Sequence, residues 1–322
     1  MGQFKDAFGS MQAEDETESR PGPLIRSPSA VAVEPGSGDV YVLESSATDM
    51  RVDRYTPAGG LLWAAGLGVN KSTGGGLCEP VRRLGADSCG IGRPSSAEDF
   101  APYAFKFAQY EGDLLAFGGE RRLLYVGDEH RVQEFDSAGK PRGQLLLVSL
   151  GGAQGDTVLA LALDEQGDLF VVYGEPERGG GGNGAAGEQV YEFGPRGTLR
   201  GSIPIVPNTV GSTVEVTGLA SDGQGRLAVI GGEATASDFV RFGDLYDVAS
   251  KTLMSTFVPP SDSDGIAFGA NDYLYVAATD DQEVTAYSPE PAKQLLSSPT
   301  RCEPAAVGDS AVALSCALQV WQ

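Results

Sequence analysis

Histidine is almost absent from this chain, since His130 is the only one among 322 residues. Ser-His-Asp catalysis and histidine-based metal sites need an imidazole beside a nucleophile, a carboxylate or further ligands. Such chemistry is therefore confined to the stretch LLYVGDEHRVQEFDSAGK, where His130 stands between two strand-like segments. We interpret His130 as a solvated turn residue and Arg131 as a donor to nearby turn carbonyls or acids, and we expect no catalytic residues.

Positive charge is also scarce, because 23 Lys and Arg stand against 44 Asp and Glu, giving a net charge of -21. Nucleic-acid binding depends on Lys and Arg contacts with phosphates, so we expect no nucleic-acid partner. Long apolar runs are missing as well, so no transmembrane segment is expected. Cations, basic proteins and neutral glycans stay open as ligands.

No segment carries a convincing helical stripe, whereas one β pattern recurs: an apolar strand, a polar turn with Gly, Asp or Asn, and an alternating strand. The six copies begin at Ala30, Leu114, Leu159, Gly218, Gly265 and Ala305. Most copies are followed by a third strand and turn, such as VQEFDSAGK, and a fourth apolar strand, such as GQLLLV. A unit of roughly 45 residues is the period of a propeller blade. The sequence thus predicts an all-β, six-bladed β-propeller of four-stranded antiparallel blades in a single domain, residues 1–322.

The ends of the chain and two insertions complete this prediction. The sixth copy ends in ALQVWQ, one strand after its hairpin, and FKDAFGS near the start has the look of a fourth strand. We expect Gly2–Gly9 to lie beside Ala317–Gln322, because a strand from the opposite terminus closes the ring and covers an open edge. A cysteine-containing excursion occupies about residues 70–107, and a Gly-rich loop, expected to be a flexible surface tip, occupies about 175–187.

The segment LYVGDEHRVQEFDSAGK resembles the NHL repeat, whose usual form is a strand ending in Tyr-Val-x-Asp, a short turn, Arg-Val-x-x-Phe and a turn with Gly. GDVYVLESSATDMRVDRYTPAGG is similar, with a longer turn. The excursion GLGVNKSTGGGLCEPVRRLGADSCGIGRP resembles one found in secreted actinobacterial NHL proteins. The resemblance covers nearly the whole chain and implies a six-bladed propeller with a binding or scaffolding role, but no shared reaction.

The four cysteines fall into two local pairs. Cys302 and Cys316 are equidistant from Asp309 in the sixth hairpin, so antiparallel pairing places them opposite each other. Cys78 and Cys89 lie near each other in the excursion. Of the three possible connectivities we expect these two local disulfides, the alternatives being buried reduced thiols or one metal site without the usual C-x-x-C pairs.

Two disulfides indicate a secreted or cell-surface protein. The start, MGQFKDAFGS, lacks a basic region followed by an apolar core, so we expect a signal peptide to have been removed.

Acidic residues stand just ahead of the first strand in five of the predicted blades. Aligned by the ring, they form a collar at one mouth of the central channel. The members of this candidate ligand or cation site are Asp113, Asp156, Glu215, Asp264 and Glu303. Such a collar suits Ca²⁺ or a cationic group, whereas the alternative is loop carboxylates scattered over a very acidic chain. We expect no cofactor, with Ca²⁺ as the one alternative.

The excursion is the second candidate surface. It contains the basic pair Arg82 and Arg83. Long loops on a rigid ring are often sites of recognition. At its end, however, are aromatic residues that fit equally well a role in covering the hydrophobic side of the propeller. These are Phe100, Tyr103, Phe105, Phe107 and Tyr110.

We therefore expect a non-catalytic extracellular module that binds a protein or glycan partner through its loops, or assembles with copies of itself. The alternative is a calcium-dependent lactonase or hydrolase of the regucalcin and gluconolactonase type, because SDSDGIAF from Ser261 is similar to a strand entry of that family. The first copy, beginning IRSPSAVAV, has no counterpart of that family's Glu-Gly-Pro motif.

Overall fold

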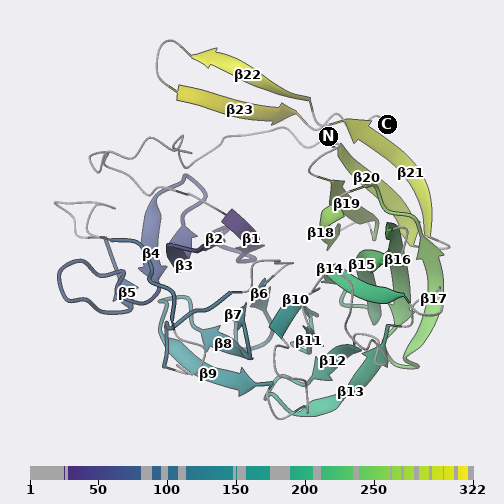
Figure 1. The fold of residues 1–322 in the computed structure, drawn as a ribbon, viewed down its shortest axis with the longest axis horizontal. Helices are drawn as coiled ribbons and strands as arrows, with labels where there is room; N and C mark the ends of the chain where they lie inside the picture. The colour runs from purple at the N-terminus through teal and green to yellow at the C-terminus, as the bar shows by residue number, and fades with distance from the viewer. Residues whose placement is uncertain are drawn as a thin grey trace. The chain divides into compact units, whose positions relative to one another are not determined.

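The computed structural model describes the chain from Ile25 to Ala317 with gaps. The described residues are 25, 28–80, 89–95, 101–107, 114–147, 150, 157–174, 189–205, 212–234, 239–261, 263–269, 272–278, 283–289, 292–299, 301–307 and 311–317. This part of the chain consists of strands in successive antiparallel sheets (Figure 1). No helix in these ranges is long and apolar enough to cross a bilayer.

Five of the sheets are propeller blades, each formed by strands that follow one another in sequence. Blade 1 contains β1 (Pro28–Val33), β2 (Val40–Ser46), β3 (Asp49–Tyr55), β4 (Leu61–Ala65) and β5 (Leu77–Cys78). Blade 2 contains β6 (Leu115–Gly118), β7 (Leu123–Asp128), β8 (Arg131–Phe135) and β9 (Pro141–Leu146). Blade 3 contains β10 (Thr157–Leu163), β11 (Leu169–Gly174), β12 (Gln189–Phe193) and β13 (Leu199–Pro204).

The remaining two blades follow the same order. Blade 4 contains β14 (Thr213–Ser221), β15 (Arg226–Ala234), β16 (Phe239–Asp247) and β17 (Thr252–Phe257). Blade 5 contains β18 (Ser263–Phe268), β19 (Leu274–Ala278), β20 (Glu283–Pro289) and β21 (Ala292–Pro299). The all-β class and the hairpin that opens each blade were therefore correctly predicted.

The prediction of six blades is wrong, because the structure is a five-bladed propeller. The sixth copy of the repeat forms a two-stranded sheet, made of β22 (Arg301–Val307) and β23 (Ala311–Ala317). The sequence repeat lies mainly in the first hairpin of each unit. The β22–β23 hairpin carries this repeat, and it was therefore counted as a sixth blade. The predicted ring closure lies outside the described residues, because Gly2–Gly9 and all but the first residue of Ala317–Gln322 are not described. The Gly-rich loop at 175–187 also lies outside the described residues.

The turns between strands three and four show why acid–glycine sequences end the strands. In the turn Asp136–Lys140, the Asp136 carboxylate accepts backbone hydrogen bonds from Ala138 and Lys140, both at 2.9 Å. Gly139 completes the turn with a φ of 73°, a left-handed conformation that favours glycine. The Asp222 carboxylate accepts the same pair of bonds in the first turn of blade 4.

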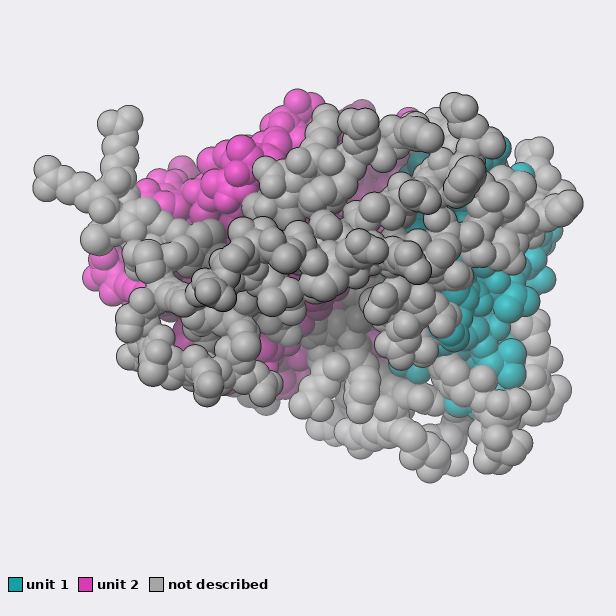
Figure 2. Space-filling model, turned by 90° about the horizontal axis from the view of Figure 1, so that it is seen from above, with its two compact units in different colours: residues 1–7, 177–191, 201–322 teal, residues 8–176, 192–200 magenta. Residues whose placement is uncertain are grey.

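The chain divides into two compact units (Figure 2). One unit, residues 8–176 and 192–200, contains blades 1 and 2 and the first two strands of blade 3. There β1 packs against β6, and β10 packs against β6 and β7. The other unit, residues 1–7, 177–191 and 201–322, contains blades 4 and 5 and the β22–β23 hairpin. Strands β12 and β13 are divided between the two units.

Candidate recognition surface

The excursion after blade 1 is closed by a disulfide between Cys78 and Cys89, as predicted. Cys78 lies in β5, which extends blade 1 by pairing with Ala64 and Ala65 of β4. Cys89 lies in an isolated β-bridge with Asn70. The excursion thus returns once to the edge of blade 1 and once to its own first turn, and the disulfide joins the two returning segments.

The second predicted disulfide is only partly tested. Cys302 and Cys316 are directly opposed partners in the β22–β23 pairing, as the equal spacing around the turn implied. Their side chains lie outside the described part of the chain, so this bond stays a prediction.

Asn70 organises the first turn of the excursion. Its side-chain oxygen accepts hydrogen bonds from the backbone N–H groups of Ser72 and Thr73, both at 3.1 Å. Its side-chain nitrogen donates to the carbonyl of Leu77 at 3.2 Å, immediately before the disulfide. Asn side chains commonly nucleate turns in this way, so one residue ties the loop to the strand that returns from it.

A buried ion-pair network attaches the middle of the excursion to blade 1. The Arg51 guanidinium contacts the carboxylates of Asp49 at 3.2 Å and Asp53 at 3.1 Å, and it donates to the carbonyl of Gly90 at 3.1 Å. Asp49 in turn accepts a bond from the backbone N–H of Gly92 at 2.7 Å. Gly92 is required here, because a Cβ at this position would lie 2.1 Å from the carbonyl oxygen of Met50.

A second buried arginine attaches the end of the excursion to blade 2. Arg131 is 1 % exposed, and its guanidinium pairs with Asp128 at 3.0 Å and with the side chain of Gln144 at 2.8 Å. It also donates to the carbonyls of Ala101 at 3.2 Å and Ala104 at 2.7 Å. The interpretation of Arg131 as a donor to turn carbonyls and acids is therefore confirmed.

The two arginines occupy the same position in successive blades. Strand pairing places Arg51 opposite Glu44 in blade 1, and Arg131 opposite Asp128 in blade 2. Each arginine thus lies in strand three opposite an acid of strand two. The repeat predicted this equivalence, but the carbonyls bound by each guanidinium lie 27 to 39 residues away in sequence, beyond any local pattern.

Burial shifts the protonation of these acids. Desolvation raises the pKa of Asp128 to about 6, although Arg131 and Gln133 act against this rise. Desolvation likewise raises the pKa of Asp53, against the attraction of Arg51 and a hydrogen bond from Tyr55. Burial alone would lower the pKa of Arg51, but Asp53, Asp49 and Glu44 raise it overall. The Arg51 guanidinium therefore stays cationic at all ordinary pH values.

The aromatic residues at the end of the excursion are packed rather than displayed. Phe105 and Phe107 are buried, with their ring centroids 5.5 Å apart. Tyr103 stacks on Phe135 at 5.6 Å, and its hydroxyl donates to the carbonyl of Gly139 at 3.0 Å. The covering role is confirmed for these three aromatics of the excursion, whereas Phe100 and Tyr110, like Arg82 and Arg83, lie outside the described residues.

His130 lies where the excursion, blade 2 and blade 3 meet. Its Nδ1 is 3.5 Å from the hydroxyl of Tyr173, and its Nε2 is 3.9 Å from the carboxylate of Glu129. Lys106, at the end of the excursion, pairs with the same carboxylate at 2.7 Å. The His130 side chain is 23 % exposed, so it is a partly solvated turn residue within a polar junction rather than a fully solvated one.

The acidic collar is not tested by the described residues. Asp113 and Asp156 are not described. Glu215, Asp264 and Glu303 fall inside β14, β18 and β22. Of these three, only the Glu215 side chain is described, and it is partly buried. In the described part of the chain, no three His, Cys, Asp or Glu side chains lie close enough together to hold a metal ion.

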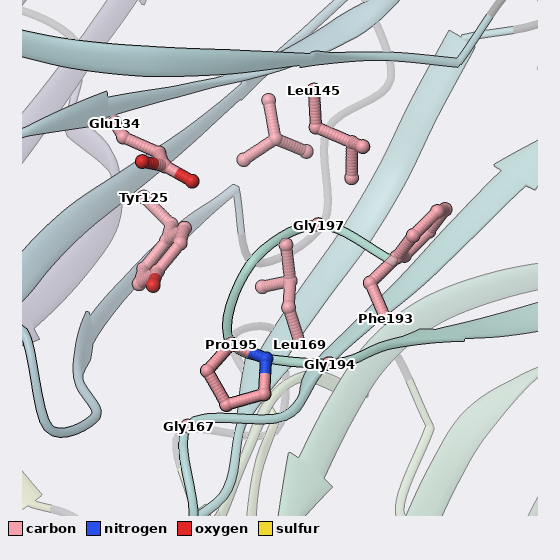
Figure 3. Close-up of a pocket in the computed structure, with 10 residues that line it drawn as sticks. Tyr125, Glu134, Leu145, Gly167, Leu169, Phe193, Gly194, Pro195 and Gly197 are labelled. Atoms are coloured by element: carbon pink, nitrogen blue, oxygen red, sulfur yellow. The ribbon is translucent and has the colours of Figure 1, made fainter. Parts of the chain in front are cut away.

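One crevice lies between blade 2 and the turns of blade 3 (Figure 3). Tyr125 and Glu134 face Phe193, Leu145 and the glycine-containing turns across it. Its interior volume of about 10 Å³ is room for about one water molecule. Because small-molecule sites usually measure ~300–1,000 Å³, this crevice is too small for a metabolite.

No family model matches the sequence, and no curated protein matches it. Solved structures resemble the fold. A chain of the nidogen/laminin complex matches with a TM-score of 0.51 at 12 % identity, over 84 % of this chain and 79 % of that chain. The luciferin-regenerating enzyme matches with a TM-score of 0.49 at 12 % identity, over 85 % and 76 %. A gluconolactonase from Xanthomonas campestris matches with a TM-score of 0.47 at 13 % identity, over 84 % and 74 %. At 12 % identity, the match to the nidogen/laminin chain shows a likeness of fold alone.

Proposed function

We propose that this protein is a non-catalytic extracellular binding or structural module of the NHL type, which recognises a protein or glycan partner through the blade-one excursion. The observation that carries the proposal is the double clamp, in which buried Arg51 and Arg131 hold the backbone of the excursion on two successive blades. A long loop fixed in this way loses little conformational entropy on binding, which favours recognition.

The disulfide supports the extracellular part of this proposal. Disulfides form and persist in oxidising compartments, and the Cys78–Cys89 bond closes a loop within the excursion. The net charge of -21 favours basic or neutral partners over nucleic acid.

The competing function is a calcium-dependent lactonase, which needs metal ligands converging on the channel mouth. Among the described side chains, no three His, Cys, Asp or Glu residues lie close enough together to form such a group. Calorimetric titration with Ca²⁺ and a hydrolysis assay with glucono-δ-lactone separate the two functions. If the protein is a binding module, Ca²⁺ titration gives no saturable heat and the lactone is not hydrolysed in a Ca²⁺-dependent way. Turnover that is lost in Glu215→Gln would establish the enzyme and overturn the proposal.

Recognition itself is tested with a displayed random-peptide library and a glycan array as probes. We expect binders whose affinity falls at least about tenfold in a Cys78→Ser/Cys89→Ser variant, because the loosened excursion must be ordered on binding. Arg142→Met, a change at an exposed residue of β9 in blade 2, serves as the control and should leave binding unchanged. Binders that tolerate the double variant, or no binders at all, would refute recognition by the excursion.

A further inference from the structure

The outer strand of blade 4 exposes apolar side chains to solvent. Leu253 and Met254 of β17 are both 48 % exposed, and Val258, just after the strand, is 78 % exposed. β17 is the last strand of its sheet and pairs with β16 on one side only. In the described part of blade 4, its other edge therefore presents unpaired backbone donors and acceptors, which are a template for a further strand.

The other outer strands carry features that discourage such pairing. Charges, glycines and prolines on an edge strand protect it from association. These features are Pro141, Arg142 and Gly143 in β9, Arg200, Gly201 and Pro204 in β13, and Lys293 and Pro299 in β21. In blade 1, β5 covers part of β4. The β17 sequence TLMSTF contains no charged residue, glycine or proline. β17 does have a register shift against β16, but the outer strands β4, β9 and β21 have similar shifts, so this irregularity does not distinguish β17.

The β17 edge is also held in place. Phe257 is buried in a core shared by blades 4 and 5, and its ring lies 4.7 Å from that of Tyr287. The hydroxyl of Tyr287 donates to the carbonyl of Val258 at 2.7 Å. The strand is therefore fixed by its own blade pair while Leu253 and Met254 remain exposed, so little ordering is needed for a second strand to pair with it.

Charge indicates which strand fits there. The fourteen residues of Val248–Ser261, VASKTLMSTFVPPS, contain no acid, and Lys251 is their only charged residue. Two copies of a chain with a net charge of -21 repel each other over most of their surfaces. They approach most easily where acids are few. The β17 strand itself carries no acid, and the acids that pair with it, Asp244 and Asp247, belong to β16 on the side away from the open edge.

We propose that β17 is a self-association edge, which pairs antiparallel with β17 of a second copy across a twofold axis. This arrangement needs no surface other than the one strand, because a twofold interface is made by the same patch on both copies. Antiparallel pairing centred on the strand places Lys251 of one copy beside Val258 of the other, so the two lysines lie at opposite ends of the interface. The proposal concerns a different part of the chain from the excursion and does not depend on the recognition function.

A single strand pair buries less surface than the ~1,200–2,000 Å² of a stable complex, so the dimer is weak. Salt screens the repulsion between the two acidic copies and strengthens the dimer. A partner of opposite charge would instead bind less tightly as salt rises.

The test is sedimentation equilibrium of the full chain up to about 300 µM, a range suited to weak dimers, at low and high salt. We expect reversible dimers that strengthen at least about threefold at high salt. Met254→Lys, which adds a charge to the edge, should weaken dimerisation at least about tenfold without lowering Tm. The matched control is Leu199→Lys on β13, where Leu199 is 47 % exposed, and it should dimerise like the wild type.

Three results would overturn the inference. If the wild type stays monomeric at both salt concentrations, β17 does not pair with a second copy, and its edge would instead pair with a strand of a different protein. Dimers unaffected by Met254→Lys form through another surface. An equal loss in Leu199→Lys shows that any added lysine weakens association, so that β17 has no special role.

Discussion

Replacing Arg131 with methionine tests the clamp that fixes the end of the excursion. Methionine keeps much of the apolar stem of Arg131 but removes the donors to Asp128, Ala101 and Ala104. Asp128 is then left buried without its cation. Removing one partner of a buried pair costs about 3–5 kcal/mol, because the other charge stays desolvated. At about 2–4 °C per kcal/mol, the expected fall in Tm is roughly 6–20 °C.

The matched control is Arg142→Met, which removes an ion pair with Asp136 in an exposed turn of the same blade. The Arg142 side chain is 53 % exposed, so its loss should cost less than about 1 kcal/mol. Both variants are measured by thermal and urea unfolding beside the wild type. If Arg131→Met proves too unstable to purify, Arg131→Lys keeps the charge but loses the fork of donors, with an expected cost of about 1.5–3 kcal/mol. Free energies of unfolding within about 1 kcal/mol of the wild type for both Arg131 variants would show that Arg131 does not fix the excursion.

Three further predictions follow from the same region. The pKa of Asp128 is raised from 3.8 to about 6, so between these values the folded state holds a proton that the unfolded state releases. The free energy of unfolding should therefore fall by about 3 kcal/mol as pH rises from about 4 to well above 6, measured by urea unfolding at a series of pH values. An Asp128→Asn variant whose free energy of unfolding has the same pH dependence would contradict this prediction. Cys89→Ser should cost about 3 kcal/mol by releasing the loop that the disulfide closes, measured by chemical unfolding against the oxidised wild type. Gly92→Ala should cost about 1–3 kcal/mol, because its Cβ meets the Met50 carbonyl, whereas Gly60→Ala, whose nearest contact is 3.2 Å away, should cost less in the same thermal assay.

The sequence predicted those features that depend on local pattern. Alternating strands and glycine turns located the hairpin that opens each blade, and close spacing identified the Cys78–Cys89 disulfide. The Arg-Val-x-x-Phe pattern identified Arg131 as a donor, because strand register alone places it at the start of strand three opposite an acid.

Features that depend on distant contacts could not be read in this way. The last hairpin carries the repeat signal, but among the described residues no third or fourth strand pairs with it, so the blade count was wrong. The attachment of Gly90 to Arg51 joins residues 39 apart in sequence, and no periodicity encodes it. The single histidine was correctly assigned to a turn, but its neighbours Lys106 and Tyr173 come from segments that only the packed blades bring together.

Hydrogen–deuterium exchange across the excursion is the most direct test of the central claim, which is that the excursion is a rigid rim for recognition. The backbone amides of Gly90, Gly92 and Ala104 all donate hydrogen bonds within the clamped region. We predict that peptides covering residues 89–95 and 101–107 exchange about as slowly as the strands of blade 2, and that Arg131→Met causes fast exchange at residues 101–107. Fast exchange of both segments in the wild type would contradict this claim, because a loop that opens freely is not a preformed recognition surface.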